Sequence, residues 1–375
     1  MLFRRKKISI GNGYGNPGAN PAPINISVVG VGGGGSNAVL RMADDCPPGV
    51  RFLALSTDIQ ALRAFKGVPT FAIGPTVTAG MGSGGQPEVG RKAMRERQDQ
   101  VAKLLEKTNM VFVTTGMGGG TGTGAASIVA DRARKRGALT VGVVTLPFTF
   151  EGPKRRAVAM DGLRQLSAKV DTLITIENDR LLRFLKGKVK LSDAFQLADR
   201  VLKQGVHGIA DLISTPGVIN VDFADVKSVM SNGGRAFMAL GEGEGRWAAL
   251  DAARSALVSP LFNASLDGAS GILFNVNGGK DLELDQVHEV AGLIRKASSP
   301  TANVIFGVTQ DPRLKKRVQI TLVTTGVTGD DDRTNTNGVV EVDRSGNASV
   351  LAMAERVVAN GHSPALSVTE TQPMF

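Results

Sequence analysis

The sequence predicts an α/β fold in which a parallel-sheet domain is joined by a central helix to a smaller α/β domain. Short runs of β-forming residues alternate with helix-length segments from about Ile24 onward, a pattern typical of a parallel sheet covered by helices. Glycine-rich segments follow several of the early strands, and the later strands lack them. Because ligands of such folds bind beyond the carboxyl ends of the strands, the functional site is expected in the first domain.

Composition narrows the class of protein. The chain has 375 residues and is 42% hydrophobic, enough for two domains with cores of their own. Its single cysteine, Cys46, excludes an intramolecular disulfide, and three histidines leave little for a zinc centre. No apolar run approaches the roughly 18 residues of a spanning helix, and residues 1–7 lack the apolar core of a signal peptide. We therefore expect a cytoplasmic protein without a transmembrane segment.

The net charge of +10 raises the question of a polyanionic partner, either nucleic acid or an anionic membrane surface. Lysine and arginine are dispersed along the chain, and aromatic residues make up only 5% of it. A platform that stacks single-stranded bases needs more aromatic side chains than this. The sequence therefore predicts no nucleic-acid partner.

The chain divides into five segments. Residues 1–23 and 328–375 have the polar, Gly-, Asn- and Pro-rich composition of disordered tails, the second with a transient helix at 348–358. Residues 24–190 form the first domain, 191–215 the central helix and 216–327 the second domain. The expected strands are 24–31, 51–55, 110–115, 139–146 and 172–176, then 236–240, 272–276, 304–308 and 318–324, with second-domain helices at 248–257 and 285–297.

The segment GMGGGTGTG at 116–124 dominates the first domain. It follows the apolar strand at 110–115 and precedes a helix-like segment at 125–130. Consecutive backbone N–H groups at a helix N-terminus stabilise an anion through hydrogen bonds and the helix dipole. So many glycines are costly to order without a ligand. The segment therefore predicts a phosphate site, and its lack of lysine excludes the P-loop pattern.

Two further glycine loops favour a triphosphate over a single pyrophosphate. Residues 30–37, GVGGGGSN, follow the first strand and formally fit G-x-G-x-x-G, with Asp58 near the spacing of a ribose-binding carboxylate. Taken alone, this pattern would suggest an NAD-dependent oxidoreductase. Residues 80–90 form a third loop that leads into a helix at Pro87, and three loops exceed what one pyrophosphate needs.

Polar side chains beyond these loops suggest the sugar and the base. Glu151 and Arg155 could contact ribose or phosphate oxygens, although Glu151 could equally be a first-turn helix charge. Phe195 and Asp199 share a face of the central helix, for which Ser192 is a plausible N-cap. An aromatic ring could stack on a base, and a carboxylate beside it could accept from guanine N1–H and the 2-amino group. This arrangement would select guanine over adenine, which has no such pair of donors. The alternative is a core phenylalanine and an exposed aspartate.

The second domain has no glycine-loop chemistry. The central helix ends at a Thr215-Pro216-Gly217 break, and a new helix starts after Asp222. Asp222 could simply be the N-cap of that helix.

These motifs, in this order from about Ile24 to Val327, resemble the tubulin/FtsZ superfamily, and most closely its bacterial cell-division members. The resemblance implies a GTPase domain, a central helix and a smaller α/β domain. The nucleotide contacts that it implies are Gly33, Gly34, Gly35, Ser36, Asn37, Gly82, Gly84, Gly85, Gly118, Gly119, Gly120, Thr121, Gly122, Glu151, Arg155, Asn178, Phe195 and Asp199. The residues that it implies for catalysis in the neighbouring subunit are Asn220, Asp222 and Asp225.

By the same resemblance, the ligands are GTP or GDP with Mg²⁺ bound mostly through water, and no metal ligand is assigned to the chain. The expected partner is the protein itself, in a head-to-tail filament at the division septum, with membrane-tethering and division proteins attached. A GTP-binding filament protein with no role in division remains open.

Overall fold

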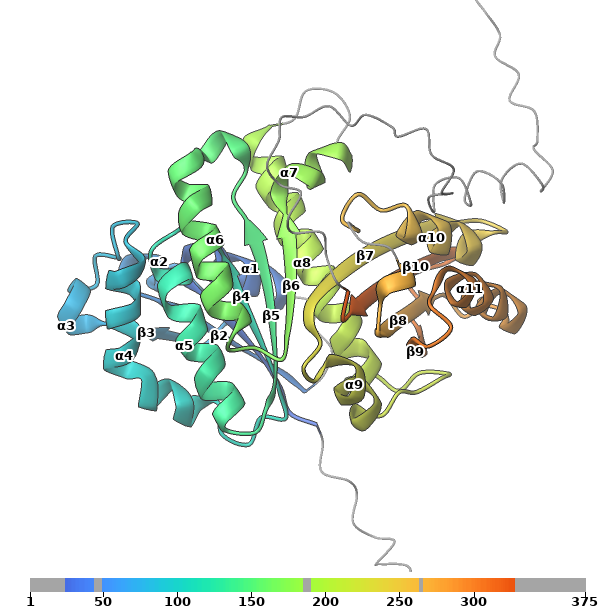
Figure 1. Cartoon of the computed structure of the whole chain (residues 1–375), viewed down its shortest axis with the longest axis horizontal. Coiled ribbons are helices and arrows are strands. Elements are labelled where there is room, and N and C mark those ends of the chain that lie inside the picture. The colour runs from blue at the N-terminus through green and yellow to red at the C-terminus, as the bar shows by residue number, and fades with distance from the viewer. Residues whose placement is uncertain (1–23, 44–48, 185–189, 263–265, 328–375) are drawn as a thin grey trace, which may run out of the picture.

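The computed structural model describes residues 24–43, 49–184, 190–262 and 266–327 (Figure 1). Both predicted tails, the helix expected at 348–358 and Cys46 lie outside these residues. Within them, the chain folds into two α/β units, with the long helix α8 running between them (Figure 1). The fold is therefore the predicted one.

A ten-stranded sheet runs through both units of the described chain, in the order β3-β2-β1-β4-β5-β6-β7-β10-β8-β9. The strands are β1 (Ile26–Val31), β2 (Val50–Ser56), β3 (Thr70–Ala72), β4 (Met110–Gly116), β5 (Leu139–Leu146), β6 (Thr172–Glu177), β7 (Gly234–Glu244), β8 (Gly271–Gly278), β9 (Asn303–Gln310) and β10 (Arg317–Thr325). Only β10 is antiparallel to its neighbours, β7 and β8. The sheet is continuous because Thr172–Ile174 of β6 pairs with Gly234–Ala236 of β7.

Each predicted strand is present. β1 and β5 are buried along their whole length and β4 along nearly all of it, as expected of parallel strands covered on both faces. β3, with three residues, was not predicted. β7 runs beyond the predicted end at residue 240, through Gly241 and Gly243. A Cβ at either position would lie about 2 Å from a carbonyl of α10 (Ala248–Leu257), so glycine lets that helix pack directly on the strand.

Helices cover both faces of the sheet. Helices α4 (Pro87–Leu104), α5 (Thr121–Lys135) and α6 (Pro153–Ser167) cover one face of the first unit. Helices α1 (Gly32–Ala43) and α8 (Leu191–Ser214) cover the other, where they pack with α9 (Phe223–Met230). The second unit packs α10 and α11 (Leu284–Ala297) against β7–β10. The remaining helices are short: α2 (Ile59–Arg63), α3 (Pro75–Thr78), α7 (Asn178–Leu181), η1 (Thr149–Glu151), η2 (Leu182–Phe184) and η3 (Leu266–Gly268).

The ends of α8 show one wrong prediction and one correct one. Lys190, not Ser192, occupies the N-cap position. Ser192 already lies within the first turn, and its hydroxyl bonds instead to the neighbouring Asp193 carboxylate. At the other end α8 stops at Ser214, because Pro216 disfavours a helical conformation for the preceding Thr215. No helix in the described residues is both long and apolar enough to cross a membrane.

Candidate functional site

Two helix N-termini meet at one pocket. β1 passes directly into α1 at Gly32, and β4 passes through the loop 117–120 into α5 at Thr121. The residues that precede these helices, Val31 and Gly120, have no polar side chain to cap them, so backbone N–H groups are left for another acceptor. The pocket has a volume of about 260 Å³. It is lined by Val31, Gly32, Gly33, Gly34, Ser83, Gly116, Met117, Gly119, Gly120, Thr121, Gly122, Thr145, Pro147, Glu151, Arg155, Asn178, Phe195, Ala198, Asp199 and Leu202.

The helix that follows the strand β4 begins within the glycine segment 116–124. Its first residue is Thr121, whereas the sequence predicted a start near residue 125. Gly118 has a φ of +97°, and a Cβ there would lie 2.7 Å from Cγ of Arg155. Its N–H donates to the Thr123 hydroxyl at 2.9 Å, which closes the loop back on the helix. The conformation therefore requires glycine at this position.

Part of the first loop faces the pocket and part of it is structural. Gly33 and Gly34 line the pocket. Gly35 is buried, and a Cβ there would lie 2.3 Å from the carbonyl oxygen of Thr114, so it serves helix-to-strand packing. Ser36 is fully buried and its hydroxyl reaches the carbonyl of Leu55 at 3.4 Å. Asn37 is exposed on α1 and does not line the pocket.

In the third loop, Ser83 rather than the predicted glycines lines the pocket. Gly82, Gly84 and Gly85 all have positive φ and shape the turn. The Ser83 hydroxyl lies 2.9 Å from that of Thr121, which lies 2.6 Å from that of Thr57. All three hydroxyls belong to buried residues. These three hydrogen-bonded hydroxyls link the segment after β2, the third loop and the start of α5.

The other end of the pocket brings together the residues predicted for sugar and base. Phe195 and Asp199 lie on the same face of α8 and both line the pocket. Phe195 is 40% exposed and contacts Phe148 edge-on, at 5.4 Å between ring centroids, so it is not a core residue. Asp199 forms an ion pair with Arg41 of α1, a residue that the sequence did not single out.

Glu151 is already engaged within the chain. One carboxylate oxygen accepts the N–H of Phe148 at 2.9 Å, and the other lies 3.1 Å from Nε of Arg155. Glu151 ends the short helix η1 and so lies before the first turn of α6. Asn178 is 4% exposed, and its Oδ1 is buried with no hydrogen-bond partner among the described residues. That orphaned acceptor in the pocket wall fits a polar ligand.

The residues predicted for catalysis lie elsewhere. Asn220, Asp222 and Asp225 are exposed between the end of α8 and the start of α9, and none of them lines the pocket. Asp222 is indeed the N-cap of α9, since Oδ1 accepts the N–H of Asp225 at 2.8 Å. Asn220 accepts the N–H of Gly217 at 2.6 Å. The described residues contain no group of three or more His, Cys, Asp or Glu that could hold a metal ion.

Comparison with known proteins agrees with this geometry. Residues 25–186 match the GTPase domain of the Tubulin/FtsZ family, and residues 234–328 match the C-terminal domain of the FtsZ family. The structure of an empty FtsZ dimer from M. jannaschii is 42% identical in sequence, with a TM-score of 0.79, over 82% of this chain and 89% of that one. The chain belongs to the Tubulin/FtsZ family.

More distant structures share the fold. GDP-bound CetZ1 from Haloferax volcanii is 19% identical, with a TM-score of 0.70, over 81% of this chain and 95% of that one. A CetZ2 protofilament structure from the same organism, with bound GTPγS, is 20% identical, with a TM-score of 0.67, over 90% and 98%. At these identities the similarity concerns the fold alone.

Membership of the Tubulin/FtsZ family identifies the chain as a cytoskeletal GTPase that binds GTP or GDP. The interpretation as an NAD-dependent enzyme is therefore wrong. The G-x-G-x-x-G pattern serves the start of α1, and Asp58 caps α2 by accepting the N–H of Ala61 at 3.0 Å. It does not line the pocket.

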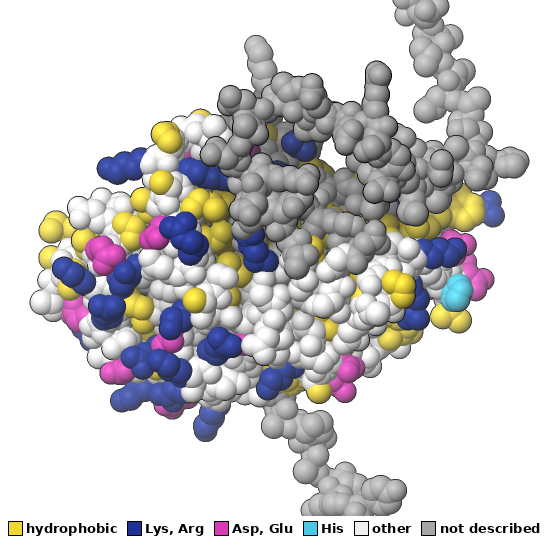
Figure 2. Space-filling model, in the orientation of Figure 1, with side chains coloured by type: hydrophobic (Ala, Val, Ile, Leu, Met, Phe, Trp, Pro, Cys, Tyr) yellow, Lys and Arg dark blue, Asp and Glu magenta, His cyan; other side chains and the backbone are white. Residues whose placement is uncertain are grey.

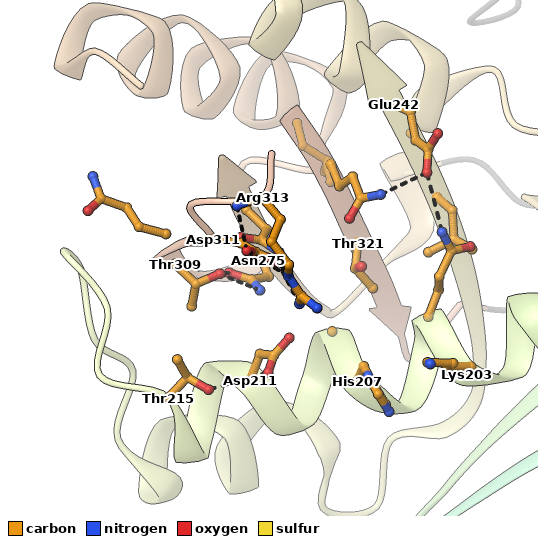
Figure 3. A pocket seen from close by; sticks show the side chains of 18 of the residues that line it. Lys203, His207, Asp211, Thr215, Glu242, Asn275, Thr309, Asp311, Arg313 and Thr321 are labelled. Carbon is orange, nitrogen blue, oxygen red and sulfur yellow. Dashed lines mark hydrogen bonds and ion pairs between the residues drawn. The ribbon is translucent and has the colours of Figure 1, made fainter. Parts of the chain in front are cut away.

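A second cavity, of about 540 Å³, lies between α8 and the strands of the second unit (Figure 3). Lys203, His207 and Asp211 border it from α8, and Thr215 borders it from just beyond the end of that helix. Across the cavity, the guanidinium of Arg313 hydrogen-bonds Asp311 and lowers the pKa of that carboxyl below its usual value. Ala198, Asp199 and Leu202 line the first pocket from the same helix, so α8 separates the two cavities.

Proposed function

We propose that this Tubulin/FtsZ-family protein assembles head to tail in response to GTP, and that each subunit completes the catalytic site of its neighbour. The role that the sequence resemblance favours is formation of the cytokinetic ring at the bacterial division septum. The proposal rests on the separation between the nucleotide pocket and the exposed carboxylates Asp222 and Asp225.

The pocket's own carboxylates are already paired with arginines of the chain. Glu151 is held by Arg155 and the N–H of Phe148, and Asp199 is held by Arg41. Phosphoryl transfer to water needs a residue that orients the attacking water. With both pocket carboxylates engaged at the sugar and base end, a carboxylate near the terminal phosphate must come from elsewhere.

Asp225 is placed for contribution from a neighbour. About 15 residues of α8 separate Asp199 from the helix end, which corresponds to about 22 Å at 1.5 Å per residue. Asp222 and Asp225 lie beyond that end and are exposed. Because the N-cap bond of Asp222 to the Asp225 N–H fixes the first turn of α9, Asp225 is held on the surface. An acceptor pocket at one end of a subunit and a donor loop at the other make a heterologous contact, which forms an open filament when the rotation does not close.

The ligands follow from the same geometry. The helix N-termini of α1 and α5 would hold the phosphates, Phe195 would stack on the base and Asp199 would accept from guanine. Mg²⁺ would be held mostly through phosphate oxygens and water and would neutralise phosphate charge. We further propose that residues 24–190 form the GTP-binding domain, 191–215 the central helix and 216–327 the second domain. The protein is proposed to lie in the cytoplasm, where other division proteins would tether it to the membrane.

Mixing two variants tests catalysis by a neighbour. Asp225→Ala should bind GTP normally and hydrolyse almost none, because it removes nothing from its own pocket. Gly119→Leu should block the pocket while leaving the donor loop intact. Gly119 suits this purpose because its Cβ would face open space, whereas one at Gly120 would lie 2.4 Å from Ser83 Oγ. A mixture should recover turnover that neither variant shows alone.

The parent protein provides the control. Its hydrolysis rate per subunit should rise steeply above a threshold concentration, since no complete site exists in the monomer. Equal hydrolysis per subunit at dilutions without polymer would refute catalysis by a neighbour. Depletion in the host separates the two biological roles: undivided, elongated cells indicate division, and normal division indicates a filament with another task.

A further inference from the structure

The positive charge of the protein is concentrated in one layer of helices. We define the basic layer as residues 87–104, 121–136 and 153–169, which contain helices α4, α5 and α6. These segments hold fourteen Lys and Arg against five Asp and Glu, a net charge of +9 out of +10 for the whole chain. Residues 191–327 hold thirteen against fourteen. The fold therefore gathers charges that are dispersed in the sequence.

The basic layer forms a continuous outer surface of the first unit. Figure 2 shows Lys and Arg side chains spread over the half of the molecule where Figure 1 places α4, α5 and α6. The first three turns of α5 are almost entirely buried. The guanidinium of Arg91 in α4 bonds to Gln165 in α6, so these two helices meet over the buried start of α5. The outer face is thus formed by α4, α6 and the C-terminal turn of α5.

Five cations of the basic layer have no hydrogen bond or ion pair with another described residue. These are Lys92, Arg95, Lys103, Lys154 and Arg156. Four of the five are exposed, and Arg156 is half-buried. Other cations of the layer are paired, as Lys135 is with Asp131 at 2.7 Å. Unpaired cations remain available to an external polyanion without breaking a contact within the protein.

The character of the layer indicates which polyanion. It contains no Phe, Tyr or Trp, so it cannot stack unpaired bases. Its only large apolar side chain exposed in the described structure is Leu104, so it lacks the apolar face with which interfacial helices enter a lipid surface. Binding must then be electrostatic, and it favours the polyanion with the highest charge density. Duplex DNA carries about one negative charge per 1.7 Å of its axis.

We propose that the basic layer binds the phosphate backbone of double-stranded nucleic acid without sequence preference. Nine of its fourteen cations are arginine, whose planar guanidinium suits phosphate. This inference revises the sequence-based prediction of no nucleic-acid partner, which relied on the dispersal of the cations along the chain. It does not depend on hydrolysis or on assembly, because every residue that it uses belongs to one subunit.

The test compares two triple variants of the full chain in the GDP state, matched in residue type. The first carries Lys92→Gln, Arg95→Gln and Lys103→Gln, all on α4. Lys154 and Arg156 are left intact because they flank the nucleotide contact Arg155. The control carries Lys280→Gln, Arg295→Gln and Lys296→Gln, which are exposed in the second unit. Both lose two lysines and one arginine, so they have the same net charge.

The readout is the anisotropy of labelled duplex DNA between 50 and 200 mM salt, with two unrelated duplex sequences. Each phosphate contact contributes about −0.9 to the slope of log affinity against log salt, so the α4 variant should lose about 2.7 of that slope. It should bind more weakly at 50 mM salt. The control should match the parent, and both duplexes should bind alike. Thermal unfolding and GTP-dependent assembly, unchanged in both variants, would show that the substitutions act on binding alone.

Several results would overturn the proposal. Equal losses in the control variant would mean that net charge, not this surface, attracts the DNA. Undetectable duplex binding by the parent at 50 mM salt would refute it directly. Binding to vesicles that contain phosphatidylserine, with no binding to duplex, would assign the layer to a membrane instead.

Discussion

Arg41 of α1 and Asp199 of α8 form an ion pair at the nucleotide pocket, although they lie 158 positions apart in the sequence. The Asp199 side chain is only 16% exposed, whereas Arg41 is 48% exposed. The guanidinium binds Oδ2, and Oδ1 makes no other hydrogen bond within the described residues. The pair therefore fixes the orientation of the carboxylate and leaves one oxygen for a base.

Asp199→Asn should change base selectivity. In the proposed site, the free Oδ1 of Asp199 would accept from guanine N1–H and the 2-amino group, whereas an amide can present a donor to that amino group. The loss of GTP affinity should be about 1.5 to 3 kcal/mol, as for a hydrogen bond to a charged group. Xanthine carries a carbonyl in place of the amino group, so the variant should gain affinity for xanthosine triphosphate. Competition between the two nucleotides measures the effect, and an unchanged preference for GTP would remove Asp199 from the base site.

Arg41→Gln separates positioning from recognition. It leaves the acceptor atoms of Asp199 in place but removes the group that orients them. We expect weaker GTP binding than in the parent, with the preference for guanine over xanthine retained. If this variant instead behaved like Asp199→Asn in the same competition, the ion pair itself would carry the selectivity.

Asn178→Ala should affect stability and affinity in opposite ways. The Oδ1 of Asn178 is buried without a partner in the described structure, and an unsatisfied buried acceptor costs about 1 to 3 kcal/mol. Removing it should leave the nucleotide-free protein equally stable or more stable in thermal unfolding. GTP affinity should fall, because the ligand loses the donor or acceptor that the asparagine supplies. Loss of both properties would make Asn178 a purely structural residue.

The first-unit strands could be predicted because burial on both faces makes them rich in valine, isoleucine and leucine without a regular polar alternation, as in β1 and β5. β3 was not predicted, because three residues are too few to show the periodicity of a strand. β7 was predicted too short because Gly241 and Gly243 look like a strand end. Their role becomes clear only once α10 is seen to pack on them.

The glycine loops of the pocket were recognisable because their backbone requirements are local. Ser83, Thr57 and Arg41 were missed because each acts through a distant partner: Thr121 lies 38 positions from Ser83 and 64 from Thr57. Ser83 lies within the third glycine loop and Thr57 lies next to Asp58. A hydroxyl residue in such a position can therefore indicate a side chain that holds the loops of the pocket together. Arg41 offers none, since only the fold places it near Asp199.

Asp131 should make stability dependent on pH. A hydrogen bond from Lys135 at 2.7 Å, with a second from Lys169 at 3.2 Å, lowers the pKa of Asp131 below its usual 3.8. A lowered pKa in the folded state means stabilisation that is present above pH 3.8 and is lost as the pH falls through the folded-state value. Asp131→Asn should therefore be less stable than the parent at neutral pH. In denaturant unfolding the difference should shrink in acid, and a gap independent of pH would show that the charge is not its cause.

Thr121 should prove to be the residue that couples the phosphate loops, because its hydroxyl lies between those of Thr57 and Ser83. Thr121→Val keeps the shape of the side chain but leaves two buried hydroxyls without their shared partner, at a cost of about 1 to 3 kcal/mol in unfolding free energy. Thr121→Ser retains the hydroxyl and should stay close to the parent. Because the three hydroxyls join three separate segments around one pocket, the valine variant should also bind GTP more weakly, and the serine variant should not. Denaturant unfolding without nucleotide and GTP titration measure the two effects independently. If the valine variant were as stable as the parent and bound GTP as tightly, the hydroxyl of Thr121 would not couple the loops.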